Sequence, residues 1–289
     1  MQLYPLSFFQ PRPAQPHLPL FVFFPGMDGT GQLLYKQIDR LAARFDIRCL
    51  AIAGNDLTNW AGLVDRSLQL IATELTEGRD IYFCGESFGA CFAMQVAGQM
   101  SAKICKLVLI NPASSLVRLP WLAGGSSAIR LLPDALYPLS ARILVNFLID
   151  ADRVAAPDRQ SLLNAMLSVQ PQSAAWRLDL LRHFQIHAVL PKIINIPVLL
   201  IAGELDRLLP SLPEVRILQQ LLPKSKTTLL PNSGHACLLE KDVYLADLLW
   251  EWVSTLTINL NDLPPPTSYL SCCGGCLPHP SPPLSKGRE

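Results

Sequence analysis

The chain has 289 residues, of which 50% are apolar and 16% are charged, and its formal net charge is +1. Charged residues make up about 25% of an average domain, so this chain can bury a large core and still leave apolar surface. The near-neutral charge gives no electrostatic case for nucleic-acid binding. No apolar run reaches the ~18 residues of a membrane-spanning helix, and the Pro-rich start is unlike a secretory signal.

Five of the eight cysteines lie in apolar, strand-like or helix-like segments: Cys49, Cys84, Cys91, Cys105 and Cys237. We expect them to be small buried thiols, which favours a reducing compartment such as the cytoplasm. The other three lie in a Pro-rich and Ser-rich tail, at Cys272, Cys273 and Cys276. Their spacing is not a zinc pattern. The sequence therefore predicts neither a metal site nor a cofactor.

Apolar strand-like runs alternate with helical patterns along most of the chain. Strands are expected at Leu20–Phe24, Ile47–Leu50, Ile81–Cys84, Lys106–Ile110, Pro197–Ile201 and Lys226–Leu230. Helices are expected at 33–41, 60–77, from Ala90 onward, at 213–222 and at 244–255. This alternation predicts an α/β fold, with a mostly parallel sheet and helices on both faces.

The alternation of strands and helices stops between residues 112 and 191, where helical patterns continue without a convincing strand. We interpret this segment as a helical cap inserted into one α/β core of residues 20–111 and 192–258; a separate helical domain is the alternative. Residues 1–19 are Pro-rich, with an edge strand expected near 3–9. Residues 259–289 lack the composition to bury a core, and we expect disorder there.

The strand at Ile81–Cys84 runs into Gly85-Glu86-Ser87-Phe88-Gly89, and a helical pattern follows at once. Strand, G-x-S-x-G and helix is the context of a nucleophile elbow, a tight turn that exposes the serine hydroxyl. A Cβ at Gly85 or Gly89 would collide with the neighbouring strand or helix. The hydroxyl lies at a helix N-terminus, where backbone N–H groups favour negative charge.

Three residues follow three different strands in the order nucleophile, acid and histidine: Ser87, Asp206 and His235. A serine hydroxyl needs a base in contact, and a histidine can take its proton and return it to a leaving group. Asp206 would hold the other ring nitrogen. The rival acids are Glu204, Asp150 and Asp152. The remaining histidines fall in the cap (His183, His187) or in the terminal segments (His17, His279).

An acyl-transfer site also needs N–H donors for an oxyanion. The residue after the nucleophile, Phe88, supplies one. We expect the second from Met27, in the glycine-rich turn after the Leu20–Phe24 strand, where glycines allow close backbone approach. A phosphate loop is the rival interpretation of 26–31, but the lysine of that motif is missing and the glycine spacing is wrong.

From Leu20 to Leu256 the sequence resembles the α/β-hydrolase superfamily. The motifs at 24–31, 85–89 and 108–115 resemble a narrower esterase/lipase/thioesterase-type family that includes plastid phytyl ester synthases and their cyanobacterial relatives. The resemblance implies acyl transfer to phytol-like alcohols or to diacylglycerol, or hydrolysis of such esters, with Ser87, Asp206 and His235 as the triad. Plant members also carry an acyltransferase-like domain, which we expect to be lacking here, and their elbow tends to read Asp and Gly at the places of Glu86 and Ala90.

We therefore expect a serine-dependent enzyme acting on a lipophilic ester or thioester, with a long-chain alcohol as an alternative acceptor to water. The acyl chain would lie under apolar cap residues, among them Trp121, Leu122, Phe147 and Leu148. The alternatives are a plain carboxylesterase, lipase or thioesterase, and a non-catalytic protein that binds a lipid. Peripheral membrane contact fits such a substrate, and the sequence predicts no protein partner.

Overall fold

The computed structural model describes residues 6–100, 104, 106–119, 125–131 and 133–257. The predictions made for Trp121, Leu122, Cys105 and the three tail cysteines therefore lie outside the described residues. The chain divides into two units, residues 1–252 and 253–289, and the fold set out below belongs to the first. Within the described ranges, no helix is both long and apolar enough to cross a bilayer.

Seven strands, among the residues described, form one sheet in the order β1-β3-β2-β4-β5-β6-β7. Only β1 is antiparallel to its neighbour, β3, and the other pairs are parallel. The predicted mostly parallel sheet is therefore confirmed. The strands are β1 Leu6–Phe9, β2 Leu20–Phe24, β3 Asp46–Ile52, β4 Ile81–Glu86, β5 Lys106–Ile110, β6 Val198–Gly203 and β7 Ser225–Leu230.

Both faces of the sheet are covered, because successive residues of a strand point to opposite sides. Leu20, Val22 and Phe24 of β2 pack into one core with helices that include α2 Trp60–Ala72, α3 Phe88–Ala97, α9 Ile186–Ile193 and α10 Ser211–Leu221. Phe21 and Phe23 pack into the other, with the 3-10 helix η1 Gln32–Gln37, the short α1 Ile38–Leu41 and α11 Leu245–Thr257. Every residue of β2 is buried, as a doubly covered strand requires.

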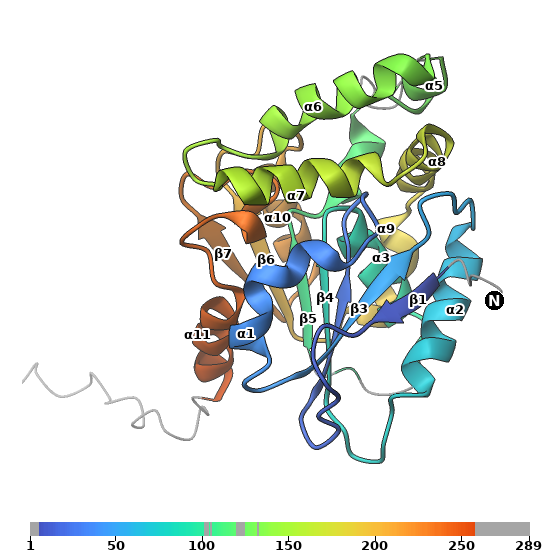
Figure 1. Cartoon of the computed structure of the whole chain (residues 1–289). Helices are drawn as coiled ribbons and strands as arrows, with labels where there is room; N and C mark the ends of the chain where they lie inside the picture. The colour runs from blue at the N-terminus through green and yellow to red at the C-terminus, as the bar shows by residue number, and fades with distance from the viewer. Residues whose placement is uncertain (1–5, 101–103, 105, 120–124, 132, 258–289) are drawn as a thin grey trace, which may run out of the picture. The chain divides into compact units, whose positions relative to one another are not determined.

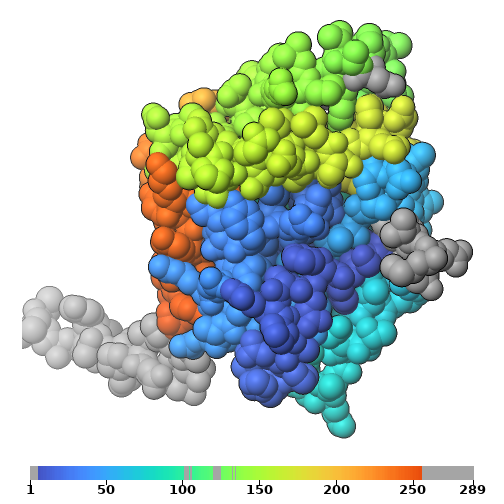
Figure 2. Space-filling view, in the orientation of Figure 1, coloured from blue at the N-terminus to red at the C-terminus, as the bar shows by residue number. Residues whose placement is uncertain are grey.

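The segment between β5 and β6 contains helices joined by loops, and no strand, in its described part. It contains η2 Ala113–Arg118, α5 Gly125–Leu131, η3 Asp134–Leu136, α6 Tyr137–Leu148, α7 Ala156–Leu167, α8 Pro171–Arg182 and α9. Figure 1 shows α5, α6, α7 and α8 together at one end of the sheet. In Figure 2 they form the green and yellow-green layer along the top of the molecule.

Two predicted helices differ from the structure. The helix expected at 33–41 is mainly 3-10, and only its last four residues are α-helical. The buried Gln37 side chain donates to the carbonyls of Leu238 and Val243, which holds this turn against the loop before α11. The helix expected to reach residue 77 ends at Ala72. Its start is capped by Asn59, whose side chain accepts from the Gly62 N–H at 3.0 Å.

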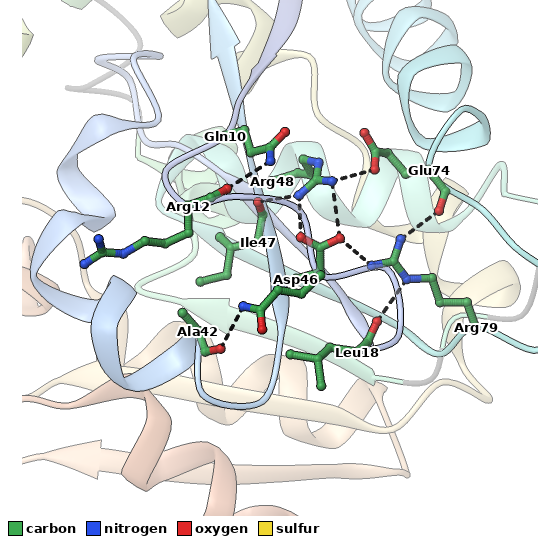
Figure 3. A network of polar contacts seen from close by, with 10 residues as sticks. Gln10, Arg12, Leu18, Ala42, Asp46, Ile47, Arg48, Glu74 and Arg79 are labelled. Atoms are coloured by element: carbon green, nitrogen blue, oxygen red, sulfur yellow. Dashed lines mark hydrogen bonds and ion pairs between the residues drawn. The ribbon is translucent and has the colours of Figure 1, made fainter.

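A buried ion network holds the start of β3, at the opposite ends of the parallel strands from their carboxyl termini (Figure 3). Asp46 pairs with Arg48 and with Arg79, each at 2.6 Å, and Arg48 also pairs with Glu74 at 2.8 Å. Asp46 and Arg48 are almost fully buried. Removing Asp46 would leave the buried Arg79 without a carboxylate partner among the described residues, a loss of about 3–5 kcal/mol. The network therefore stabilises the sheet away from the site described next.

Candidate active site

Ser87 lies in a strained turn between β4 and α3, with φ 56° and ψ −115°. The flanking glycines make this turn sterically possible. A Cβ on Gly85 would lie 2.2 Å from the carbonyl oxygen of Gly89, and one on Gly89 would lie 1.9 Å from that of Phe24. The Ser87 N–H donates to the Ile110 carbonyl at 2.9 Å. Backbone strain of this kind is held by its surroundings and is found at functional sites.

Ser87, His235 and Asp206 form one continuous chain of contacts. The Oγ of Ser87 lies 2.9 Å from Nε2 of His235, and Nδ1 of His235 lies 2.7 Å from Oδ2 of Asp206. The serine follows β4, the aspartate follows β6 and the histidine follows β7. All three strands are parallel, so their carboxyl ends deliver the side chains to the same edge of the sheet.

Asp206 is held rigidly for its contact with the imidazole. Its Oδ1 accepts the N–H groups of Leu208 and Leu209 at 2.9 and 3.0 Å, and the Ser211 hydroxyl donates to its Oδ2. Burial opposes the charged form, but the charge and hydrogen bond of His235 outweigh it and lower the pKa of Asp206. The aspartate is therefore an anion beside the imidazole at neutral pH.

His235 is 4% exposed. Burial by itself would lower the pKa of the imidazole, but the charge and hydrogen bond of Asp206, together with the charge of Glu86, raise that pKa above its ordinary value. The histidine is therefore a stronger base than a free imidazole. It is also oriented, because its Nδ1 is engaged by Asp206 and its Nε2 faces the serine.

Two residues that the sequence did not single out for this role hold the histidine loop. Asn111, fully buried at the end of β5, donates through Nδ2 to the carbonyl of His235 at 2.7 Å and accepts the Gly203 N–H at 2.8 Å. Glu240 accepts the Gly234 N–H and the Ser233 hydroxyl, both at 2.8 Å. Only the position of Asn111, directly after a strand, could have indicated its role, because loops at that edge carry function.

The glycine turn after β2 lies beside the nucleophile. A Cβ built on Gly26 would be 4.0 Å from Cβ of Ser87. No hydrogen bond among the described residues uses the N–H of Met27 or of Phe88, so both donors are free to serve a ligand. The Met27 carbonyl, by contrast, accepts from the Arg177 guanidinium of α8 at 2.6 Å.

A second acidic group lies near the triad without joining it. Burial raises the pKa of Glu86 to about 7, and the charge of Asp28 adds to this effect while that of His235 opposes it. Its Oε1 has no hydrogen-bond partner within the described part of the chain. Glu86 is thus a half-buried carboxyl beside the nucleophile, and burial favours its protonated form.

The alternative acids and histidines do not join the triad, and the two described acyl-chain residues, Phe147 and Leu148, differ in exposure. Glu204, His183 and His187 are exposed. Asp150 lies 3.9 Å from Arg207, and Asp152 is exposed. Phe147 is 48% exposed, whereas Leu148 is buried in a small core and its carbonyl accepts the Ala236 N–H, next to His235, at 2.8 Å.

A cavity of about 750 Å³ lies apart from the triad. It is lined by residues of β1, of η1 and the loop before it, and of α7, among them Phe9, Thr30 and Ser161. The candidate site lies where Ser87, His235 and Asp206 are in contact, because a nucleophile must touch its base. Within the described residues, no group of three His, Cys, Asp or Glu is placed to hold a metal ion.

A parallel sheet that brings a strained serine, a histidine and an aspartate together at its carboxyl edge defines the α/β-hydrolase class. A model of the alpha/beta hydrolase family matches residues 21–248. The chain therefore belongs to the alpha/beta hydrolase family, and the predicted fold class is confirmed.

The comparisons with individual proteins agree on an esterase-type hydrolase. The chain is 29% identical to phytyl ester synthase 1 of Arabidopsis thaliana over 82% of its own length, but over only 37% of the length of that protein. It is 28% identical to a pimeloyl-[acyl-carrier protein] methyl ester esterase of Nitrosomonas europaea, over 69% of this chain and 81% of that one.

Among solved structures, MenH from S. aureus shares the fold with a TM-score of 0.69 and 16% identity, covering 86% of this chain and 98% of that one. The similarity to phytyl ester synthase 1 confirms the predicted resemblance to phytyl ester synthases.

Proposed function

We propose that the chain cleaves lipophilic esters or thioesters through an acyl-enzyme formed on Ser87. The observation that carries the proposal is the unbroken row of contacts from Asp206 through His235 to Ser87. A non-catalytic lipid-binding protein would not require these hydrogen-bonded contacts between the three side chains. The strained Ser87 backbone and the raised pKa of His235 support the same proposal.

The first half of the reaction forms the acyl-enzyme. Ser87 Oγ attacks the carbonyl carbon of the substrate while its proton moves to Nε2 of His235. The carbonyl oxygen becomes an oxyanion, which accepts hydrogen bonds from the N–H groups of Met27 and Phe88. When the intermediate collapses, the bond to the leaving alcohol or thiol breaks, and that group takes the proton from His235.

The second half reverses these roles with a new nucleophile. Water or an alcohol gives its proton to His235 and attacks the acyl carbonyl; collapse breaks the bond to Ser87 Oγ, which regains the proton. Water yields a free acid, and an alcohol yields a new ester. Asp206 remains an anion throughout and stabilises the imidazolium.

The lipophilic substrate class is supported by two independent features. Phe147 belongs to an exposed apolar face of α6. It borders a narrow crevice, too small for a water molecule, whose lining also includes Leu205, Gly234, Asp150 and Arg207. The similarity to a phytyl ester synthase supports phytol as an acceptor. The same apolar face fits a protein that works at the periphery of a membrane.

Four cysteines are buried free thiols, as predicted: Cys49, Cys84, Cys91 and Cys237. Such thiols fit a reducing compartment.

A fluorophosphonate probe tests the nucleophile directly. We expect the wild-type chain to be labelled and Ser87→Ala to remain unlabelled, and equal labelling of both would refute the assignment. Supplying a long-chain acyl donor with phytol then separates transfer from hydrolysis. Phytyl ester supports transfer, whereas free acid alone supports a plain esterase, which the similarity to the pimeloyl methyl ester esterase also favours.

A further inference from the structure

A buried arginine of the cap touches the glycine turn of the candidate active site. Arg177 lies in α8 and is only 2% exposed. Its Nη1 donates to the Met27 carbonyl at 2.6 Å and its Nη2 donates to the Ala53 carbonyl at 3.0 Å. The guanidinium therefore joins the two loops that follow β2 and β3.

The turn is built to admit this side chain. Gly29 has φ +69°, and a Cβ on it would lie 2.6 Å from Nη1 of Arg177. On the far side, the Gly29 carbonyl accepts the Ile52 N–H at 2.7 Å. The turn that carries Met27 is thus held between β3 and a side chain that arrives from the cap.

Arg177 carries a positive charge, which is not needed to fill space between α8 and the loops. Its hydrogen bonds among the described residues go to carbonyl oxygens and not to a carboxylate, although the charges of Asp28 and Asp56 favour its protonated form. Burial disfavours that form and lowers the pKa of Arg177, but a guanidinium remains charged in proteins. A buried cation that is bound mainly to carbonyl oxygens is costly for the fold, so its retention needs a reason.

We propose that Arg177 is a positioning residue for the oxyanion hole: by binding the Met27 carbonyl it fixes the backbone of that residue, so that the Met27 N–H, on the preceding peptide, faces the developing oxyanion. It also adds positive charge beside that turn. The inference depends on the proposed serine mechanism. A donor must be aligned before the reaction to stabilise the transition state more than the substrate. Losing Arg177 should therefore lower kcat with little change in KM.

The chain offers a matched control on the same helix. Trp176 also anchors α8, but its Nε1 donates to the Thr58 carbonyl at 3.0 Å, away from the glycine turn. Arg177→Met and Trp176→Phe each remove polar anchorage of α8, and only the first affects the Met27 peptide. A purely structural role for Arg177 predicts similar effects of the two variants.

The experiment measures p-nitrophenyl ester turnover per active site, with sites counted by fluorophosphonate, together with the affinity for a trifluoromethyl ketone. We expect Arg177→Met to lower kcat per site by ~10²-fold, to weaken the ketone by a similar factor and to change KM less than about threefold. Arg177→Lys should recover about tenfold of the loss, because it keeps a charge and a donor. Trp176→Phe should stay within about threefold of wild type.

A kcat per site for Arg177→Met that matches Trp176→Phe would overturn the inference, even if both variants melt earlier. Should Arg177→Met fail to fold, Arg177→Lys carries the test, and a kcat per site equal to wild type would be the contrary result. The failure of the proposed function looks different, since the wild-type chain would then neither turn over the ester nor react with fluorophosphonate.

Discussion

The helices α6 and α8 both belong to the segment between β5 and β6, yet they meet their surroundings in opposite ways. In α8, six of the twelve residues are buried, and two side chains donate to loops of the sheet. In α6, only Ala141, Val145 and Leu148 are buried. Its exposed apolar side chains are Leu139, Ile143, Leu144 and Phe147.

The difference indicates a division of work within the cap. A helix anchored by buried hydrogen bonds can hold a backbone donor in place, as catalysis by preorganised groups requires. A helix with an exposed apolar face can contact a lipophilic substrate or surface, since isolated soluble domains rarely leave such a patch without use. Figure 1 shows that α6 lies farther from the sheet than α7, at the outer side of the layer.

The largest expected effect is the loss of kcat on replacing Ser87, and the effects of changes in α6 and α8 are compared with it. Ser87→Ala should lower kcat by ~10⁴-fold or more on any ester, because no other hydroxyl contacts His235 among the described residues. Thermal stability should change little, since the serine is small and its backbone conformation is held by its neighbours. Residual turnover within tenfold of wild type would contradict the assignment.

The next effect is a shift in pH dependence. His235 must be neutral to act as a base, and Asp206 raises its pKa, so the acidic limb of the kcat/KM profile should lie above the ordinary histidine value. Asp206→Asn should lower kcat by roughly 10³-fold and move that limb to lower pH. A limb that stays in place would show that another group controls it.

A third comparison separates the two helices by stability. Leu181→Ala in α8 removes a side chain that is 2% exposed and should lower the free energy of unfolding by about 2–4 kcal/mol. Ile143→Ala in α6 removes one that is 54% exposed and should change it by less than about 0.5 kcal/mol. Chemical denaturation measures both, and equal losses would contradict the division.

The smallest effect concerns substrate length. Ile143→Ser with Phe147→Ser should raise KM for long-chain esters by roughly tenfold, because each change removes about 1–3 kcal/mol of apolar contact at most. The KM for a short-chain ester should stay the same, and this serves as the internal control. An equal rise for both esters would exclude α6 from chain recognition.

Much of the sheet could be predicted because its strands are buried on both faces and appear as continuous apolar runs. The residues that meet at its edge were predictable for a related reason, since carboxyl ends of parallel strands converge and Ser87, Asp206 and His235 each follow one. Their catalytic roles remain predictions until the experiments above are done.

Arg177 could not be assigned from the sequence, because its partner Met27 lies 150 positions away and only the folded cap brings them together. Glu240 was missed for a different reason: its partners Ser233 and Gly234 are near it in sequence, but the contacts depend on the path of the histidine loop. The 3-10 form of η1 likewise depends on the distant carbonyls that Gln37 reaches.

The most direct test of the central claim is to trap the acyl-enzyme. A rapidly quenched mixture of the chain with a p-nitrophenyl ester should gain the mass of one acyl group, and peptide mapping should place it on Ser87. An unmodified Ser87 together with full ester turnover, or an acyl group on any other residue, would contradict the account.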